Sequence, residues 1–254
     1  MAISEANREW PLSAASASVF LLLEETASTN AVLMADFEAD PFSVVVTLNQ
    51  RQGKGRLSRE WLNRPGEGLA LSVLVAPTEQ SEAKNFPDTL VPLVAGYSVV
   101  RALRDLGFHK SVMKWPNDVL VGGRKLAGIL CEARLDCSMV VGIGVNLRFA
   151  SERPHPNAVS LADLAQLTLG IEDDLTSRVV ANLRLVLEKN RREQLQLVTS
   201  VLDTLGREVE VIPQSNRPWF GRAMSVTEDG GLEVVTEHGE RRTVVSSDIV
   251  HLNQ

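Results

Sequence analysis

The chain has 254 residues, of which 44% are hydrophobic and 23% charged, and its formal net charge is −6. This composition is typical of a globular protein with a substantial core and excludes an intrinsically disordered chain. The acidic balance argues against non-specific binding of nucleic acid or of an anionic membrane surface by the protein as a whole.

The sequence carries no signal for export or for a membrane anchor. Its first apolar run, residues 19–23, is too short for a secretory signal, and no run approaches the ~20 residues of a membrane helix. Two cysteines, Cys131 and Cys137, are too few for a disulfide framework or a four-ligand zinc site. We therefore expect a soluble cytoplasmic protein whose thiols are idle.

Strand and helix patterns alternate in the first hundred residues. Apolar and β-branched runs predict strands at residues 19–23, 43–48 and 69–75. Ser28 or Thr29 is suited to cap a short helix that runs through Phe37. Apolar residues at helical spacing predict a longer helix over residues 88–106, with Pro92 in its first turn, where a missing N–H costs little.

Strands dominate the next part of the chain before a helix returns. They are predicted at residues 111–115, 119–121, 125–132 and 139–147, and Gly122-Gly123 is typical of a two-residue hairpin turn. Asp173 or Asp174 is expected to cap a long helix from about Leu175 to at least Glu193. From Arg207 onward, short alternating strands are separated by glycine turns.

These elements predict an α+β fold with a central mixed or antiparallel sheet, flanking helices and a small C-terminal β module. The change of pattern at Gly206 divides the chain into a domain of residues 1–205 and a domain of residues 206–254. About 50 residues is near the lower limit for independent folding, so we expect the small domain to pack on the larger one.

A basic segment that contains glycines lies between the second and third predicted strands. Residues 49–64 hold one acid, Glu60, and five cations: Arg51, Lys54, Arg56, Arg59 and Arg64. Gly53 and Gly55 let a ligand approach the backbone, the cations suit phosphate or carboxylate, and Trp61 offers a flat face for a heterocycle. Neither a Walker A loop nor a full dinucleotide fingerprint is present. The segment indicates a loop for an anionic nucleotide, with a solvated basic loop as the alternative.

A second group of polar side chains lies at strand ends. The run KWPND at residues 114–118 ends one strand, and the run GRKLAGIL at residues 123–130 starts the next. A buried ammonium needs a partner, so Lys125 indicates an anionic ligand unless its side chain extends to water.

Taken in order, five motifs resemble those of the biotin–protein ligases, also called holocarboxylase synthetases. They are residues 28–30 (STN), the segment from Gln50 to Trp61, the KWPND run, the GRKLAGIL run, and residues 142–146 (GIGVN). The resemblance spans nearly the whole chain and implies a class II synthetase-like catalytic domain followed by a small SH3-like β-barrel. Fewer than 30 residues precede Ser28, so we expect the monofunctional type without an N-terminal DNA-binding domain.

The resemblance implies a reaction in two steps, that of a biotin–[acetyl-CoA-carboxylase] ligase. Biotin and ATP form biotinyl-5′-AMP, and biotin is then transferred to a lysine of a biotin carboxyl carrier domain. Mg²⁺ is implied with ATP, and its protein ligands are unknown. The implied partner is the carrier protein, with no DNA and no membrane, and we expect a monomer or a weak homodimer.

The resemblance also implies roles for individual residues. Lys125 and Arg56 would be the catalytic cations. The residues implied for biotin are Ser28, Thr29, Gln50, Gly53, Lys54, Arg56, Lys125 and Gly128. Those implied for the nucleotide are Arg59, Trp61, Asn117, Ile129 and Asn146. Because an acyl-adenylate hydrolyses unless it is shielded, we expect the loop of residues 49–68 to be mobile when empty and to close over it.

Two positions depart from the family's loop pattern. Lys54 stands where arginine is usual and loses its bidentate fork, and Ser58 stands where glycine is common, which would restrict the loop if a positive φ were needed. The nearest rival is a lipoate ligase or octanoyl transferase of related fold. A transcriptional regulator that binds biotinyl-AMP conflicts with the acidic balance, and an idle biotin-binding protein conflicts with the presence of both Arg56 and Lys125.

Overall fold

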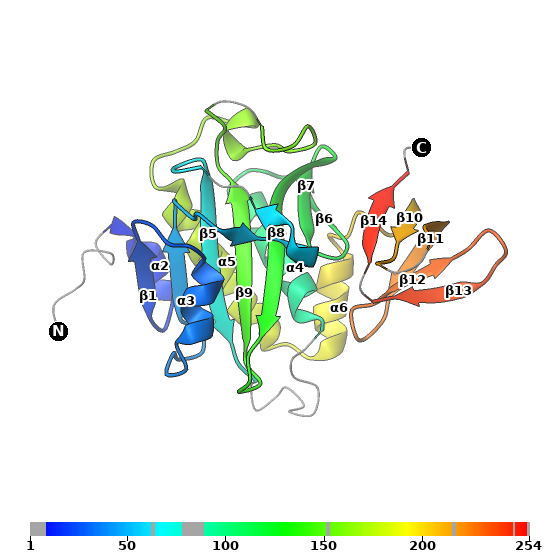
Figure 1. The fold of residues 1–254 in the computed structure, drawn as a ribbon, viewed down its shortest axis with the longest axis horizontal. Helices are drawn as coiled ribbons and strands as arrows, with labels where there is room; N and C mark the ends of the chain where they lie inside the picture. The colour runs from blue at the N-terminus through cyan, green and yellow to red at the C-terminus, as the bar shows by residue number, and fades with distance from the viewer. Residues whose placement is uncertain are drawn as a thin grey trace.

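The structure, a computed structural model, describes residues 9–61, 64–77, 89–150, 153–214, 217–245 and 247–252, with the backbone alone at residue 58. A seven-stranded sheet with helices on both faces is followed by a five-stranded antiparallel sheet at the C-terminal end (Figure 1). This arrangement confirms the α+β class with a central mixed sheet and a C-terminal β module.

The central sheet has the strand order β1-β2-β5-β9-β8-β7-β6. Its strands are β1 (Phe20–Leu23), β2 (Val44–Thr47), β5 (Gly68–Val75), β6 (Ser111–Lys114), β7 (Asp118–Val121), β8 (Arg124–Ala133) and β9 (Met139–Asn146). The pair β1–β2 is parallel and the other neighbouring pairs are antiparallel. All seven predicted strands are confirmed to within one residue at each end. Gly122 and Gly123 both have positive φ, as a tight hairpin turn between β7 and β8 requires.

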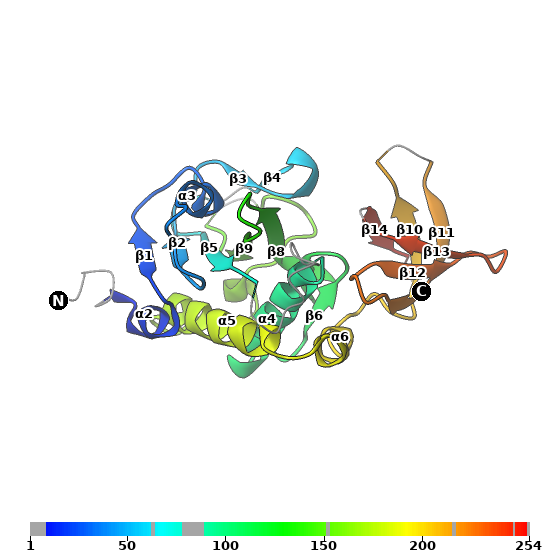
Figure 2. The ribbon, with the colours of Figure 1, turned by 90° about the horizontal axis from the view of Figure 1, so that it is seen from below.

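Helices lie on both faces of the central sheet (Figure 2). One face carries α2 (Pro11–Ser16), α4 (Val91–Asp105), α5 (Ile171–Leu187) and α6 (Arg191–Thr199). The other carries α3 (Thr29–Ala35), which Ser28 caps by accepting the Ala31 N–H. The cap at Ser28 is therefore confirmed, although α3 ends two residues before Phe37. The helix predicted over residues 88–106 is α4, which begins at Val91. Its predicted first residue, 88, lies outside the described residues.

The single helix predicted from Leu175 to Glu193 is wrong, because the structure has two helices there. α5 begins earlier, after Gly170, and ends at Leu187. Asn190 then starts α6: its side chain accepts the Glu193 N–H, and the Glu193 carboxylate accepts the Asn190 N–H. This reciprocal capping box is a strong signal for a new helix start within the predicted one.

The predicted cap at Asp173 or Asp174 is also wrong. Both residues lie in the first turn of α5. The Asp173 carboxylate instead accepts the backbone N–H groups of Leu12 and Ser13, at 3.1 and 2.7 Å. It thus satisfies the start of α2, which has no side-chain cap of its own. The contact ties the two helices together.

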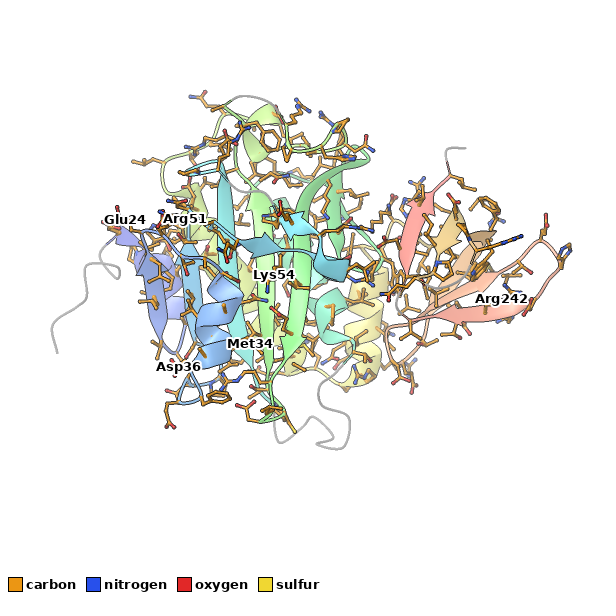
Figure 3. The ribbon with its side chains drawn as sticks, viewed as in Figure 1. Glu24, Met34, Asp36, Arg51, Lys54 and Arg242 are labelled. Atoms are coloured by element: carbon orange, nitrogen blue, oxygen red, sulfur yellow. The ribbon has the colours of Figure 1, made fainter. Side chains whose placement is uncertain are left out.

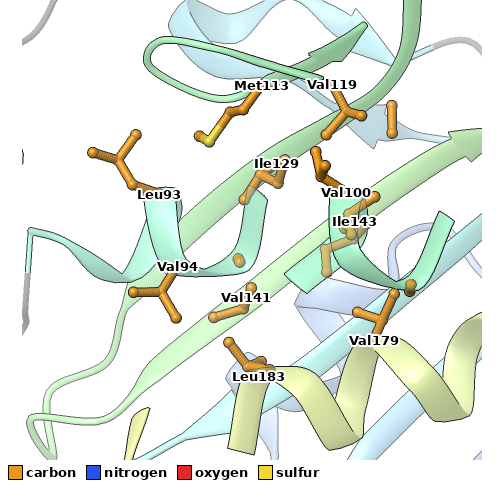
Figure 4. Close-up of a cluster of buried hydrophobic side chains, with 14 of the residues drawn as sticks. Leu93, Val94, Val100, Met113, Val119, Ile129, Val141, Ile143, Val179 and Leu183 are labelled. Atoms are coloured by element: carbon orange, nitrogen blue, oxygen red, sulfur yellow. The ribbon is translucent and has the colours of Figure 1, made fainter. Parts of the chain in front are cut away.

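The two faces of the central sheet carry separate hydrophobic clusters. Large side chains such as Val141 and Ile143 of β9 pack against α4 and α5 in the main core (Figure 4). A smaller cluster lies under α3: Leu33, Val45, Leu74 and Val140. Between the large residues of β9 stand Gly142 and Gly144, whose missing side chains leave room above the sheet on the α3 face.

The C-terminal sheet has the order β13-β12-β11-β10-β14 and lies beside the β6 end of the molecule (Figure 1). Its strands are β10 (Glu208–Ile212), β11 (Trp219–Val226), β12 (Leu232–Val235), β13 (Arg241–Val244) and β14 (Asp248–His251). Gly230 and Gly239 have positive φ at the predicted turns. We call this sheet and its turns the C-terminal module. The division into domains at residues 205 and 206 stays a prediction.

Trp115 joins the C-terminal module to the central sheet. Its indole N–H donates to the Gly230 carbonyl at 2.9 Å, and its backbone N–H donates to the Thr204 hydroxyl oxygen at 2.9 Å. Thr204 Oγ1 lies 3.0 Å from His251 Nε2. Because the Thr204 oxygen accepts from Trp115, its own proton is available to His251, which then accepts it as a neutral imidazole. The junction is thus satisfied by an uncharged His251, while Asp203 Oδ2, 3.8 Å from its Nδ1, acts in the opposite sense.

We expect His251 to make the protein less stable in mild acid. Burial lowers the pKa of His251 from 6.5 to about 4. Between these values the unfolded chain binds the proton and the folded chain does not, so stability is lost as the pH falls from about 6.5 towards 4. The full shift is worth up to about 3 kcal/mol.

Denaturant unfolding at pH 7 and at pH 4.5 measures this loss. His251→Gln should lose less stability between the two pH values than the wild type, by about 1–3 kcal/mol. His238→Gln, at an exposed site in the same module, is the matched control and should behave as the wild type. Equal pH dependence in His251→Gln and the wild type would contradict the assignment.

Candidate active site

A cavity of about 430 Å³ opens on the α3 face of the central sheet, within the size range of small-molecule sites. Small residues form its floor: Ala70 of β5, Gly128 of β8, and Gly142 and Gly144 of β9. Its walls are formed by the N-terminal end of α3, the basic segment, the KWPND run and the C-terminal module. The cavity therefore lies where the glycines of β9 leave the sheet uncovered.

Lys125 reaches this cavity because of a β-bulge in β8. The pairing shifts between Val119 and Leu120, which face Ala127 and Lys125, so Leu126 is an extra residue in β8. Leu126 and Ala127 are consecutive, yet both lie in the main core. The bulge turns Lys125 from the core face to the side of Gly128, and simple strand alternation could not have predicted this orientation.

The ammonium of Lys125 pairs with the Asp118 carboxylate at 2.6 Å. Its Nζ also lies 5.4 Å from the ring centroid of Trp61. Lys125 therefore has protein partners and does not simply extend to water. Arg56 Nη1 lies 3.5 Å from the Asn117 side-chain oxygen, at the limit of a hydrogen bond. Arg56 and Lys125 line the same cavity.

The cavity is electropositive. It is lined by three acids, Glu60, Asp118 and Asp248, and by five cations: Lys54, Arg56, Arg59, Lys114 and Lys125. Burial lowers the pKa of Arg56, with Asp248 and Asp118 acting against it, and burial also lowers the pKa of Lys114. The cations are thus partly removed from water, and an anion between them would be screened less than at the surface.

The basic segment forms a small hairpin over the sheet. It consists of β3 (Gly53–Lys54), a 3₁₀ turn η1 (Arg56–Ser58) and β4 (Glu60–Trp61). Lys54 lies on the α3 side of the sheet in Figure 3. The left-handed residue of the segment is Leu57, with φ of 57°, and not Ser58. The departure at Ser58 therefore imposes no strain of the kind anticipated.

Trp61 lies against the glycines of the cavity floor. A Cβ at Gly144 would overlap its indole ring, and one at Gly128 would come within 3.0 Å of it. The glycines in β8 and β9 therefore serve close approach of an aromatic side chain.

The C-terminal module contributes to the cavity, which the sequence did not indicate. Asp248 pairs with Arg59 of the basic segment, and the cavity is also lined by Ile212, Ile249 and Val250. Asp248 belongs to none of the motifs identified in the sequence. Its role depends on how two sheets pack, and sequence spacing carries no signal for that.

The residues predicted for the site are mostly brought together. Those that line the cavity are Ser28, Thr29, Gln50, Lys54, Arg56, Arg59, Trp61, Asn117, Lys125, Gly128 and Ile129. The Ile129 side chain is part of the main core, and its carbonyl accepts the Asn117 amide at 2.8 Å. Gly53 and Asn146 do not line the cavity. A Cβ at Gly53 would lie 2.5 Å from the Trp61 carbonyl oxygen, so Gly53 permits the hairpin to form.

Asn146 supports the site from behind. Its amide donates to the carbonyls of Lys125 and Val159, at 3.3 and 3.1 Å. It thus holds the start of β8 against the segment that follows β9. Among the other lining residues, Asn30, Lys114 and Asp118 had no predicted role, although all three belong to motifs identified in the sequence.

Potential metal ligands and thiols are sparse in the part of the chain that the structure describes. No group of three or more potential metal ligands occurs there. Cys131 and Cys137 are free, and burial raises the pKa of the Cys131 thiol. No helix among the described residues is long and apolar enough to cross a membrane.

Two family models of biotin ligases match the chain. Residues 22–148 match the Biotin/lipoate A/B protein ligase family, and residues 204–252 match the Biotin protein ligase C terminal domain. The chain is 32% identical over 242 residues to the Biotin--[acetyl-CoA-carboxylase] ligase of Mycobacterium tuberculosis, covering 91% of this chain and 88% of the relative. It is 26% identical to the bifunctional ligase/repressor BirA of Bacillus subtilis, covering 85% and 68%.

A solved structure of a biotin protein ligase has the same fold as this chain. The biotin protein ligase from Aquifex aeolicus in complex with biotin and ATP is similar with a TM-score of 0.78 and 27% identity, covering 92% of this chain and all of the other. The chain belongs to the biotin protein ligase family, as its motifs predicted, and the rival reading as a lipoate or octanoate enzyme is not favoured.

Proposed function

We propose that this chain is a biotin–[acetyl-CoA-carboxylase] ligase that makes biotinyl-5′-AMP and transfers biotin to a lysine of a carrier domain. The observation that carries the proposal is that Arg56 and Lys125 line one cavity with Thr29 and Gln50. Cations suit the reacting carboxylate and phosphate, and the polar pair suits the ureido ring of biotin. The named relatives support the same assignment.

In the first step, a biotin carboxylate oxygen attacks the α-phosphorus of ATP and pyrophosphate leaves. Both reactants are anions, so their approach is opposed by charge. Arg56 and Lys125 offset this repulsion and stabilise the negative charge that develops on the phosphate oxygens. In the second step, the neutral amine of a carrier lysine attacks the biotinyl carbonyl, AMP leaves, and an amide forms with loss of a proton.

Mg²⁺ is proposed to enter with the phosphates of ATP. Carboxylate oxygens are ligands that Mg²⁺ prefers, and Asp118 and Asp248 present them at the cavity. Each of them pairs with a cation in the structure, Asp118 with Lys125 and Asp248 with Arg59, so either would supply at most part of a shell that substrate phosphates and water complete. When bound, the ion supplies further positive charge to the phosphates.

The hairpin of the basic segment, from β3 to β4, is proposed to close over the adenylate and exclude water. Its link to Asp248 holds Arg59, and both side chains are partly exposed, so the pair is worth little stability. We expect Asp248→Ala to speed tryptic cleavage at Arg51–Arg59 about two- to fivefold. Biotin with ATP should slow cleavage of the wild type.

Mass spectrometry of the tryptic fragments over time measures both effects. Glu240→Ala breaks an exposed pair with Arg242 elsewhere in the same module and is the matched control. Cleavage that is equally fast with and without biotin and ATP would show that the hairpin does not close on the ligands.

We also propose the partner and the assembly. The carrier domain of a biotin-dependent carboxylase is the acceptor, no DNA or membrane takes part, and the protein acts in the cytoplasm as a monomer or a weak homodimer. The name of the Mycobacterium tuberculosis relative supports the carboxylase acceptor, and the acidic net charge supports the absence of DNA and membrane partners.

The test is incubation with radiolabelled biotin, ATP, Mg²⁺ and an apo carrier domain. We expect label on the carrier, and none when ATP is omitted or the acceptor lysine is replaced with arginine. Label from lipoate or octanoate, with none from biotin, would assign the related lipoate-type activity instead.

A further inference from the structure

A chain of buried polar side chains leads away from Thr29 to a carboxylate outside the cavity lining. It runs from Thr29 through Ser72 of β5 and Asn30 of α3 to Glu132 of β8. Thr29 and Asn30 are at most 6% exposed and reach the cavity, whereas Ser72 is fully buried outside its lining, so the Ser72 proton must find a protein partner. Gly142 makes the chain possible, because a Cβ there would overlap the Asn30 side chain.

Glu132 makes the shorter of the two hydrogen bonds that set the orientation of the Asn30 amide. Its Oε2 lies 2.6 Å from Asn30 Nδ2, which also donates to the Leu130 carbonyl at 3.3 Å. A carboxylate accepts and does not donate, so the NH₂ group must face β8. The Asn30 oxygen consequently faces Ser72.

That orientation determines the protons of the two hydroxyl groups. Ser72 Oγ lies 2.6 Å from Asn30 Oδ1 and 2.7 Å from Thr29 Oγ1. The amide oxygen can only accept, so Ser72 gives it its single proton. Ser72 must then accept from Thr29. Gln50 Oε1 lies farther from Thr29 Oγ1, at 3.2 Å, and already accepts the Thr29 backbone N–H at 2.9 Å.

Thr29 therefore presents lone pairs, and no proton, to the cavity. Gln50, whose oxygen is held by the backbone of Thr29, presents its NH₂ group as a donor. One acceptor beside one donor is the complement of a cyclic urea, whose N–H donates and whose carbonyl accepts.

We propose that Glu132 is a positioning residue that makes Thr29 an obligate hydrogen-bond acceptor and so selects a ligand ring with an N–H at that point. The inference rests on the proposed function, because it takes the ring to be that of biotin. Glu132 does not line the cavity and acts through Asn30 and Ser72.

The test compares biotin with its two cyclic carbamate analogues, in which one or the other ureido N–H is replaced by oxygen. Against the wild type, one carbamate should bind far more weakly than biotin, since its ring oxygen would face the lone pairs of Thr29. Replacing Glu132 with an apolar residue should weaken this discrimination. We expect the Kd of that carbamate divided by the Kd of biotin to fall about tenfold or more in Glu132→Leu.

Three variants and isothermal titration calorimetry decide the matter. Glu132→Gln keeps an oxygen that can accept from Asn30, so it should retain the wild-type ratio. Ser72→Ala breaks the chain at another point and should lower the ratio as Glu132→Leu does. A merely structural role would weaken biotin and carbamate alike and leave the ratio unchanged, so an unchanged ratio in Glu132→Leu and Ser72→Ala would overturn the inference.

The two proposals fail in different ways. A wild-type protein that does not bind biotin would overturn the proposed function, and this inference with it. A wild type that binds and transfers biotin, with carbamate discrimination unaffected by the variants, would overturn the inference alone.

Discussion

Replacing Lys125 with alanine should slow the formation of biotinyl-5′-AMP by ~100-fold or more. Lys125 lies in the cavity with Arg56, and its ammonium is held 2.6 Å from Asp118. The variant would lose a cation where negative charge develops, and it would leave the Asp118 carboxylate facing the phosphate without its partner. Both changes oppose the meeting of two anionic substrates.

Release of pyrophosphate under single-turnover conditions measures this step directly. Lys110→Ala removes a lysine at an exposed position before β6, outside the cavity lining, and should leave the rate unchanged. A rate near that of the wild type in Lys125→Ala would show that another residue provides the charge.

Replacing Trp115 with alanine should lower the free energy of unfolding by about 3–5 kcal/mol. The side chain is 2% exposed, belongs to the main core and donates to the Gly230 carbonyl of the C-terminal module. Its loss would leave a large cavity and an unpaired carbonyl at the junction of the two sheets. Because Asp248 lines the cavity from the same module, we also expect weaker ligand binding.

Denaturant unfolding followed by far-ultraviolet circular dichroism provides the measurement. Trp115→Phe keeps most of the packing and removes the indole N–H, so it should cost less, about 1–2 kcal/mol. A loss below about 1 kcal/mol in Trp115→Ala would contradict the view that this side chain joins the module to the sheet.

The strands could be predicted well because their signals are local. β-branched runs, the Gly122-Gly123 turn and the Ser28 cap each depend on neighbours in sequence, and the structure confirms them. The α5–α6 region was predicted wrongly because an apolar pattern continues across the break. The capping box at Asn190 and Glu193 was the signal that could have divided it.

The site was predicted less completely because parts of it depend on tertiary packing. The bulge that turns Lys125 into the cavity extends over one residue and interrupts no visible pattern. Asp248 reaches Arg59 from a sheet that lies almost 190 positions further along the chain. Asn30 was identified within a helix cap motif, and only the missing side chain of Gly142 explains why it can turn inward.

A crystal structure of the protein with biotinyl-5′-AMP is the most direct test of the claim that clustered cations bring two anionic substrates together. We predict that the phosphate contacts both Arg56 and Lys125, that the ureido ring lies at Thr29 and Gln50, and that Trp61 lies beside the adenine. An adenylate bound in the cavity with its phosphate in contact with neither cation, or one bound outside the cavity, would contradict the account.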